Sequence, residues 1–163
     1  MIAIALGANL PSRAGPPRAT LRAALQALAQ NGVRVARLSP LYRTPAWPDP
    51  REPEFVNAAA VIETKLSPAD LLATLQQTET HFGRERSAAN APRTLDLDIL
   101  DYEGRVEQGP PVLPHPRMTA RAFVLVPLAD VAPNWRHPVT GESVASLLAA
   151  LPEAERAAVK RTK

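Results

Sequence analysis

The segment R-T-L-D-L-D-I-L-D places two carboxylates, Asp96 and Asp98, two residues apart within an otherwise apolar run. In a β-strand the side chains alternate between faces, so both carboxylates lie on one face and the aliphatic residues on the other. Such neighbours are roughly 7 Å apart at the backbone, and their carboxylates can converge on one divalent cation or on two cations roughly 4 Å apart. Oxygen ligands without cysteine or clustered histidine favour Mg²⁺ or Mn²⁺ over zinc.

Three arginines, Arg84, Arg86 and Arg93, precede the two carboxylates. The residues around them show no apolar periodicity and predict a loop that leads to the same end of the strand. Carboxylates that hold a metal beside guanidinium groups that hold phosphate oxygens are typical of a phosphoryl-transfer site. No glycine-rich phosphate-binding motif occurs, so the nucleotide would be bound in another way. The alternative is a half-exposed strand with an acidic face, which an isolated D-x-D favours.

The elements that carry these residues follow from periodicity and turn signals. Residues 1–9 are an apolar run typical of a buried strand, and residues 94–102 alternate strictly. The clearest helix is predicted over residues 67–83, with Ser67 as N-cap and Pro68 at the first helical position. We further expect strands at 33–39 and 55–64, helices at 18–32, 117–133 and within 143–163, and loops at 40–54 and 84–93.

This order of elements predicts the fold class. Strand, helix, strand, strand, helix and strand indicate an α+β fold with a ferredoxin-like βαββαβ core and extra C-terminal helices. The antiparallel sheet would be packed between helices in three layers. A length of 163 residues fits a single domain over residues 1–163. Five prolines in residues 40–54 predict a stiffened loop after a short extended piece, and the basic C-terminal end is expected to fray.

Composition excludes several classes of protein. The chain has no cysteine, which rules out disulfides, thiolate nucleophiles and Cys-based zinc sites. No segment approaches the ~20 apolar residues of a membrane span, and the first ten residues lack the basic region of a signal peptide. We therefore expect a cytoplasmic enzyme or binding module with no membrane partner. The basic residues are 16 Arg and 3 Lys, which indicates an anionic partner only weakly.

Several motifs together resemble one known family. I-A-L-G-A-N-L, L-S-P-L-Y-R-T-P-A-W, F-V-N-A-A-A-V-I-E-T, P-R-T-L-D-L-D-I-L and L-P-H-P-R-M occur here in order between residues 2 and 135. In order and spacing they are similar to the 6-hydroxymethyl-7,8-dihydropterin pyrophosphokinases of folate biosynthesis. The resemblance implies transfer of the pyrophosphoryl group of ATP to the hydroxymethyl group of the pterin, with release of AMP. It also implies two Mg²⁺ ions as cofactors, and we expect a monomer.

The resemblance assigns roles to individual residues. Asp96 and Asp98 would hold the two Mg²⁺ ions, and Arg84 and Arg93 would act with them in catalysis on the triphosphate. The loop of residues 84–93 would close over the bound substrates. The positions that match the ATP side of the family's site are Gln76, Glu79, Arg84, Arg86, Arg93, Ile99, His115 and Arg121.

A flat, electron-poor pterin calls for stacking aromatic rings and hydrogen-bonding groups at its edge. By the same resemblance, Phe55 and Phe123 match the stacking pair and Asn57 matches the amide that reads the edge. The wall of the site would come from the proline-rich loop through Thr44, Pro45 and Trp47. The chain departs from many family members in lacking an Arg-Trp pair before Pro92, which removes a loop tryptophan and a loop arginine. Without the resemblance, the two phenylalanines would be assigned to the core.

Two other classes of function compete with this enzyme. One is a nucleic-acid-binding domain on the same ferredoxin-like plan, but the exposed aromatic pattern of an RNA-binding sheet is missing. The other is a non-catalytic module that binds a nucleotide or another small ligand, which leaves the paired aspartates unexplained. We therefore expect ATP and the pterin as small-molecule partners and no nucleic acid.

Overall fold

The computed structural model describes residues 1–84 and 92–162. Its strands are β1 (Ile2–Ala8), β2 (Val33–Leu38), β3 (Tyr42–Thr44), β4 (Phe55–Thr64), β5 (Asp96–Tyr102), β6 (Glu107–Gln108), β7 (Val112–Leu113) and β8 (Lys160–Arg161). Its helices are α1 (Pro17–Gln30), α2 (Pro68–His81), α3 (Ala122–Val131), α4 (Val144–Ala149) and α5 (Glu153–Ala157), with a 3₁₀ turn at Met118–Ala120.

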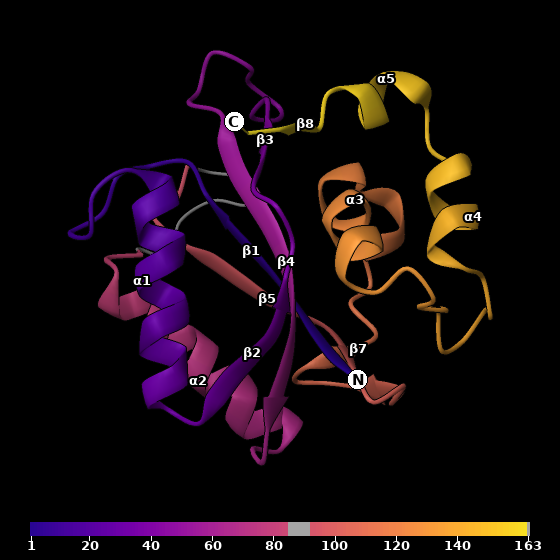
Figure 1. Ribbon diagram of the computed structural model, residues 1–163, viewed down its shortest axis with the longest axis horizontal. Helices are drawn as coiled ribbons and strands as arrows, with labels where there is room; N and C mark the ends of the chain where they lie inside the picture. The colour runs from indigo at the N-terminus through magenta and orange to yellow at the C-terminus, as the bar shows by residue number, and fades with distance from the viewer. Residues whose placement is uncertain (85–91, 163) are drawn as a thin grey trace.

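A single antiparallel sheet forms the centre of the molecule (Figure 1). Its strand order is β5-β1-β4-β3-β8, and β2 also pairs with β4. The strand β4 is ten residues long, so it accommodates β3 along its first half and β2 along its second half. The chain is thus a mixed α and β protein with an antiparallel sheet, as the sequence predicts.

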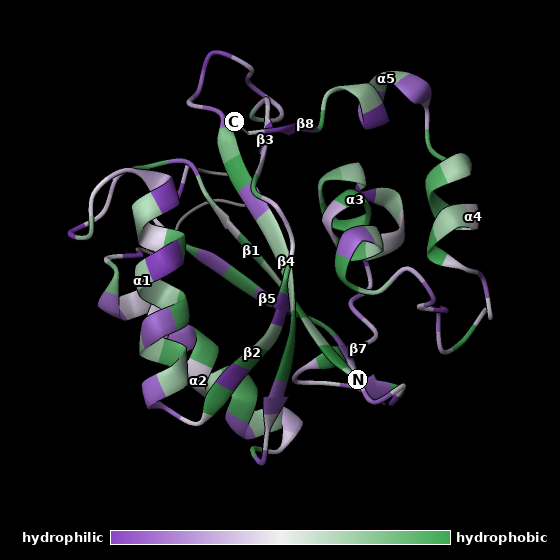
Figure 2. Ribbon diagram, in the orientation of Figure 1, coloured by the Kyte–Doolittle hydropathy of each residue, from purple (hydrophilic) through white to green (hydrophobic). Residues whose placement is uncertain are grey.

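Helices cover both faces of this sheet (Figure 1). On one face, α1 and α2 pack leucines against the large aliphatic residues of β1, β4 and β5. On the other face, α3 packs against smaller residues of the same strands, and α4 packs against α3 (Figure 1). Figure 2 shows the apolar sides of the helices turned toward the sheet. Burial of these two apolar layers is the main stabilising contribution to the fold.

The helix α2 shows why the local sequence signals are reliable here. The Ser67 hydroxyl accepts the backbone N–H of Asp70 at 3.1 Å, which satisfies one of the free N–H groups of the first turn. Pro68 occupies the first helical position, where no N–H is needed. After the helix, Gly83 has a φ of +85°, a conformation that favours glycine. The helix that precedes the arginine loop therefore has defined ends.

Three features differ from the sequence expectations. Near the basic end of the chain, which was expected to fray, Lys160–Arg161 pairs with β3 as strand β8. A small hairpin of β6 and β7 lies in a stretch for which no strands were expected. The strand β5, which carries the two aspartates, begins at Asp96 rather than at residue 94. Just before it, the carbonyl of Arg93 accepts the N–H groups of Asn9 and Leu10, which directly follow β1.

Candidate active site

The sheet register aligns the predicted site residues in one row. Asp96 pairs with Gly7, and Gly7 pairs with Asn57, across three adjacent strands. The next pair along β5 and β1 is Asp98 with Ala5. Directly paired residues of an antiparallel sheet point to the same face, so both aspartates and the asparagine share the face that α3 covers. With ~4.8 Å between strands, Asp96 and Asn57 are roughly 10 Å apart at the backbone.

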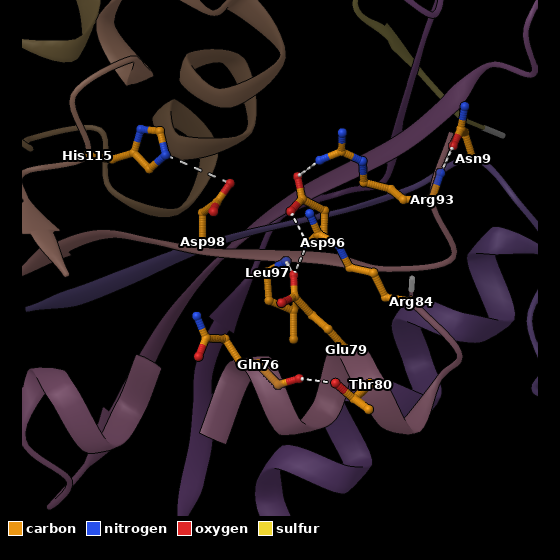
Figure 3. A network of polar contacts seen from close by, with 10 residues as sticks. All are labelled: Asn9, Gln76, Glu79, Thr80, Arg84, Arg93, Asp96, Leu97, Asp98 and His115. Atoms are coloured by element: carbon orange, nitrogen blue, oxygen red, sulfur yellow. Dashed lines mark hydrogen bonds and ion pairs between the residues drawn. The ribbon is translucent and has the colours of Figure 1, made fainter. Parts of the chain in front are cut away.

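Asp96 is held by two arginines in this structure (Figure 3). Arg84 donates from Nη1 to Oδ1 at 2.8 Å, and Arg93 donates from Nη1 to Oδ2 at 3.2 Å. All three side chains are partly buried, with exposed fractions of 18–26%. The structure therefore brings together three of the four residues expected to act in catalysis, and it pairs the carboxylate with the guanidinium groups.

Glu79, expected at the nucleotide, is buried in this structure. The sequence resemblance placed it at the nucleotide, but the residue is only 5% exposed and lies beneath the strand. Its Oε2 accepts the backbone N–H of Leu97 at 2.9 Å and also a hydrogen bond from Arg84. Burial raises the pKa of Glu79, while the N–H of Leu97 and the charge of Arg84 act in the opposite direction. Glu79 thus supports β5 and Arg84 through these two contacts, and its role at the nucleotide stays a prediction.

Asp98 is in a different environment from Asp96. Partial burial, followed by the negative charges of Asp96 and Glu79, raises the pKa of Asp98 to about 7, although 37% of its side chain stays exposed. Its Oδ2 lies 3.9 Å from Nε2 of His115. A carboxylate with a raised pKa binds a proton readily, and it gains most from an added cation.

The His115 ring has a fixed orientation. Its Nδ1 accepts the backbone N–H of Arg117 at 3.2 Å, and the backbone N–H of His115 donates to the carbonyl of Leu100 at 2.9 Å. Burial, then the positive charge of Arg121, lowers the pKa of His115. A neutral ring whose Nδ1 accepts must carry its proton on Nε2. His115 therefore presents an N–H donor on the side of Asp98 (Figure 3).

Asn57 is also oriented by its neighbours. Its Nδ2 donates to Oγ1 of Thr44 at 2.8 Å, and both residues are buried. Its Oδ1 lies over Gly7, where an added Cβ would come within 2.8 Å of it. Only glycine allows this close approach between β1 and the amide. Within residues 1–84 and 92–162, the contact with Thr44 is the one side-chain hydrogen bond of Asn57, so the carbonyl oxygen and the second N–H of its amide are candidates for a ligand contact.

The expected aromatic residues lie partly exposed around this face. Phe123 is 38% exposed at the start of α3, with the Arg121 guanidinium 5.5 Å from its ring centroid. Phe55 is half-buried at the start of β4, paired with Thr44. Trp47 is 72% exposed on the proline-rich loop, and Pro45 is exposed beside it. Aromatic surface is therefore exposed at Trp47 and Phe123 and in part at Phe55, two residues before Asn57 on β4.

Asn9 belongs to the site region, although the sequence analysis did not single it out. It is 3% exposed, and its Oδ1 accepts the backbone N–H of Arg93 at 2.8 Å. Its Nδ2 donates to the carbonyl of Pro53 at 3.1 Å. One side chain thus links the segment just before β5 to the proline-rich loop. The sequence signal that could have identified this residue is a polar amide directly after an apolar strand.

The remaining expected residues are placed as follows. The Ile99 side chain is 4% exposed in the core of the α1 and α2 face, so only its backbone can reach the site face. Gln76 is half-buried on α2, one turn before Glu79 (Figure 3). Arg86 lies outside the described residues, as do Asn90 and Ala91 and with them most of the loop expected to close.

The metal-binding capacity of this region rests on the two aspartates. Within residues 1–84 and 92–162, no group of three or more His, Asp or Glu side chains forms a closed metal site. Mg²⁺ is commonly held by one or two carboxylates, with waters and substrate phosphates completing its octahedron. The donor set of Asp96 and Asp98 fits such a shared ion and does not fit an ion held by protein alone.

Comparison with known proteins gives one consistent family. Residues 3–133 match the family model described as 7,8-dihydro-6-hydroxymethylpterin-pyrophosphokinase. A relative from Pseudomonas aeruginosa named 2-amino-4-hydroxy-6-hydroxymethyldihydropteridine pyrophosphokinase is 44% identical over 151 residues, covering 91% of this chain and 90% of the relative. A relative of the same name from Synechocystis sp. is 41% identical over 147 residues, covering 89% of this chain and 73% of the relative.

The fold is also similar to solved structures. A crystal structure of an HPPK-DHPS protein in complex with substrates aligns with a TM-score of 0.70 at 12% identity. The alignment covers 91% of this chain and 42% of the other, so this chain spans less than half of that protein. At this identity the likeness concerns the fold.

Proposed function

Because the chain belongs to the 7,8-dihydro-6-hydroxymethylpterin-pyrophosphokinase family, we propose that the row of Asp96, Gly7 and Asn57 is its active site. The protein is an ATP-dependent pyrophosphokinase of folate biosynthesis. ATP supplies the transferred group and 6-hydroxymethyl-7,8-dihydropterin accepts it, which yields AMP and the pterin diphosphate. The observation that carries the assignment is the register, which aligns an acidic strand and an amide on one face of the sheet.

The separation within this row suits the pterin. Asn57 lies two strands away from the aspartates, roughly 10 Å at the backbone, and Thr44 lies one strand further on β3. A bicyclic ring held at Asn57 directs its hydroxymethyl group along the row, over Gly7, toward β5. The small side chains on this part of β1, Gly7 and Ala5, leave room for the ring. Phe123 on α3 and Phe55 on β4 would stack on its faces.

Asp96 and Asp98 are the residues that would hold two Mg²⁺ ions between the triphosphate and the pterin hydroxyl. The support is their shared face, their partial exposure and the raised pKa of Asp98 to about 7, which marks a position that favours a cation. Bound Mg²⁺ would neutralise phosphate charge and make the hydroxyl of the pterin a better nucleophile.

Arg84 and Arg93 occupy the position from which phosphate oxygens can be reached. In this structure both donate hydrogen bonds to Asp96. Their positive charges therefore lie beside the carboxylate that would hold a metal, close to where the phosphates would bind. If Asp96 held a metal instead, the two guanidinium groups would be available for bidentate contact with the triphosphate. His115 adds a neutral N–H donor on the other side of Asp98.

Other expectations remain proposals. We infer closure of residues 84–93 over the triphosphate only from Arg84 and Arg93 at the two ends of that loop, because 85–91 lie outside the described residues. The strand order β5-β1-β4, with β2 beside β4 and helices in the connections, supports a ferredoxin-like βαββαβ core and a single domain. A cytoplasmic monomer that binds no nucleic acid remains our prediction. None of the described helices is long and apolar enough to cross a membrane.

The direct test is a product assay with ATP, Mg²⁺ and 6-hydroxymethyl-7,8-dihydropterin. We expect AMP in equal amount to the pterin diphosphate, and no AMP when the pterin is left out. Formation of ADP would contradict pyrophosphoryl transfer.

The pterin position is tested separately with Phe123→Ala. This substitution should weaken pterin binding by about 1–3 kcal/mol, the scale of lost aromatic stacking, and leave binding of an ATP analogue nearly unchanged. Equal losses for both ligands would assign Phe123 to the core.

A further inference from the structure

Tyr42 extends the row of site residues by one strand. It pairs with Asn57 in the register of β3 and β4, so its side chain shares the face of the proposed pterin site. The residue is 8% exposed, and its hydroxyl donates to Oδ2 of Asp130 on α3. Burial, then the hydrogen bond and charge of Asp130, raises the pKa of Tyr42 to about 12. The hydroxyl therefore keeps its proton, and remains a donor, at every pH at which an enzyme of this kind is assayed.

The two residues of this contact belong to opposite walls of the proposed pterin site. Tyr42 stands two residues before Thr44, which holds the amide of Asn57 in place. Asp130 is in the last turn of α3, and the first turn of the same helix carries Phe123. The Tyr42–Asp130 hydrogen bond thus links the hydrogen-bonding wall to the stacking wall, across 88 residues of sequence.

The strand that carries Tyr42 needs such an anchor. With three residues, β3 offers few ladder hydrogen bonds of its own. On its outer side it pairs with β8, where Tyr42 is opposite Arg161, and the N–H of Thr162 donates to the carbonyl of Leu41 at 2.9 Å. The chain end and Asp130 therefore fix β3 from two directions.

The helix α3 is anchored on its other flank as well. After the helix, the indole N–H of Trp135 donates to Oδ2 of Asp101 at 2.7 Å, and both residues are buried. Asp101 is on β5, the strand of the aspartate pair. One hydrogen bond thus ties the helix region to the metal strand, and the Tyr42 hydrogen bond ties it to the pterin wall.

We propose that Tyr42 and Asp130 are positioning residues for the pterin: their hydrogen bond sets the gap between Phe123 on α3 and the Thr44–Asn57 pair. This inference rests on the proposed function of that face. A flat ring can stack on Phe123 and form hydrogen bonds at its edge with Asn57 at the same time only if the distance between these two walls is maintained. Small misplacements weaken such binding strongly. Neither residue needs to touch the substrate.

The test compares the loss of the hydroxyl group from two buried tyrosines, Tyr42 and Tyr102, on opposite faces of the sheet. Tyr42→Phe and Asp130→Ala break the contact, whereas Asp130→Asn keeps an acceptor oxygen. The matched control is Tyr102→Phe, because Tyr102 is 5% exposed and donates its hydroxyl to the carbonyl of Leu66 within the other core. Each variant is measured for thermal unfolding, for the Kd of an ATP analogue with Mg²⁺, and for the KM of the pterin.

We expect Tyr42→Phe and Asp130→Ala to raise the pterin KM about tenfold, or about 1.4 kcal/mol, with kcat and the Kd of the ATP analogue within about twofold of wild type. Asp130→Asn should restore most of the affinity. Tyr102→Phe should lower thermal stability to a similar extent and leave the pterin KM unchanged.

Two results would overturn the inference while the proposed function stands: a wild-type pterin KM in Tyr42→Phe and Asp130→Ala, or equal losses for both ligands. Asp130 is exposed, so Asp130→Ala leaves no cavity and answers the question even if Tyr42→Phe folds poorly. A wild-type protein that binds no pterin and forms no AMP would instead overturn the proposed function, and the inference with it.

Discussion

The two faces of the central sheet are built from alternate residues of the same strands, but they differ in what they carry. Toward α1 and α2, β1 presents Ile4 and Leu6, both nearly inaccessible to solvent. Toward α3 it presents Ala5 and Gly7, the latter beneath the Asn57 amide. On β1 the first face is thus filled with large aliphatic side chains, and the second combines small residues with the polar groups of the proposed site.

This difference shows how one strand can serve stability and chemistry at once. Large side chains of β1 on one face contribute buried apolar area that keeps the sheet folded. The other face can then tolerate a glycine, a buried amide and two adjacent carboxylates, which would each weaken an isolated strand. Substitutions on the two faces should therefore have separable effects, on stability for one face and on turnover or ligand binding for the other.

The largest effect is expected from the aspartates of the α3 face. Asp98→Ala should reduce turnover by about a thousandfold or more, because the triphosphate loses a metal ligand. Stability of the apo protein should not fall, since Asp98 is subject to repulsion from Asp96 and Glu79. Asp96→Ala should reduce turnover as much. Steady-state AMP formation and thermal unfolding measure the two quantities.

A matched control for the removal of charge is Glu63→Gln, an exposed residue of β4 that pairs with Arg34. It should keep wild-type turnover. Near-normal AMP formation by Asp98→Ala in Mg²⁺ would show that the acidic face is not a metal site. It would also contradict the assignment of catalysis to the α3 face of the sheet.

The α1 and α2 face should give the converse result. Leu6→Ala should lower the free energy of unfolding by about 3 kcal/mol, the typical cost of a cavity in a packed core, because Leu6 is 2% exposed within that core. Turnover per folded molecule should remain near wild type below the unfolding transition. Urea unfolding and active-site titration measure these. A large loss of kcat in fully folded Leu6→Ala would mean that the two faces are not separable.

The contact between Gly7 and Asn57 sharpens the comparison within a single strand. Gly7→Ala would place a Cβ 2.8 Å from Oδ1 of Asn57, so the amide must move. We expect about tenfold weaker pterin binding, or about 1.4 kcal/mol, and unchanged binding of an ATP analogue. Isothermal titration of Gly7→Ala, Asn57→Ala and the double variant forms a complete cycle. Fully additive losses would show that the glycine does not act through the asparagine.

The smallest effect concerns pH. The pKa of Asp98 is raised from 3.8 to about 7 in the folded chain, so the folded state holds this proton more tightly than the unfolded state. Its contribution to stability is complete below about pH 4 and is lost as the pH rises through about 7. Asp98→Asn should therefore match wild type near pH 4 and exceed it near pH 8 by about 1 kcal/mol, after allowance for solvent screening.

Urea unfolding in EDTA at the two pH values measures this difference. Parallel pH profiles for wild type and Asp98→Asn would show that Asp98 titrates normally. The same pair of measurements with excess Mg²⁺ should reduce the advantage of Asp98→Asn at pH 8, since an ion bound by the carboxylate pair stabilises only the wild type.

Most of the fold could be predicted from local signals. The alternation in residues 94–102, the N-cap at Ser67 and the apolar first strand each correspond to an element of the structure. Strand β8 could not be predicted, because two basic residues carry no strand pattern and are ordered only by pairing with β3. The β6–β7 hairpin is similarly short, and its residues have no alternation to detect.

The site was predictable in residue types more than in geometry. The alternation rule places Asp96 and Asp98 on one face, and the register adds that Asn57 shares it. Sequence motifs could not show that Glu79 is buried under Leu97, because its role depends on where α2 packs against β5. They could not show Asn9 or the Tyr42–Asp130 contact either, since both join segments far apart in the chain.

The two tryptophans of the chain differ in exposure, 72% for Trp47 and 6% for Trp135. Their fluorescence should therefore separate into two components: red-shifted emission that acrylamide quenches readily, and blue-shifted emission that is protected by the core. Energy transfer or quenching by a pterin near the proline-rich loop would appear in the first component, and loss of the α3 packing would appear in the second. A Trp47→Phe variant would then report unfolding alone and a Trp135→Phe variant ligand binding, without any attached dye.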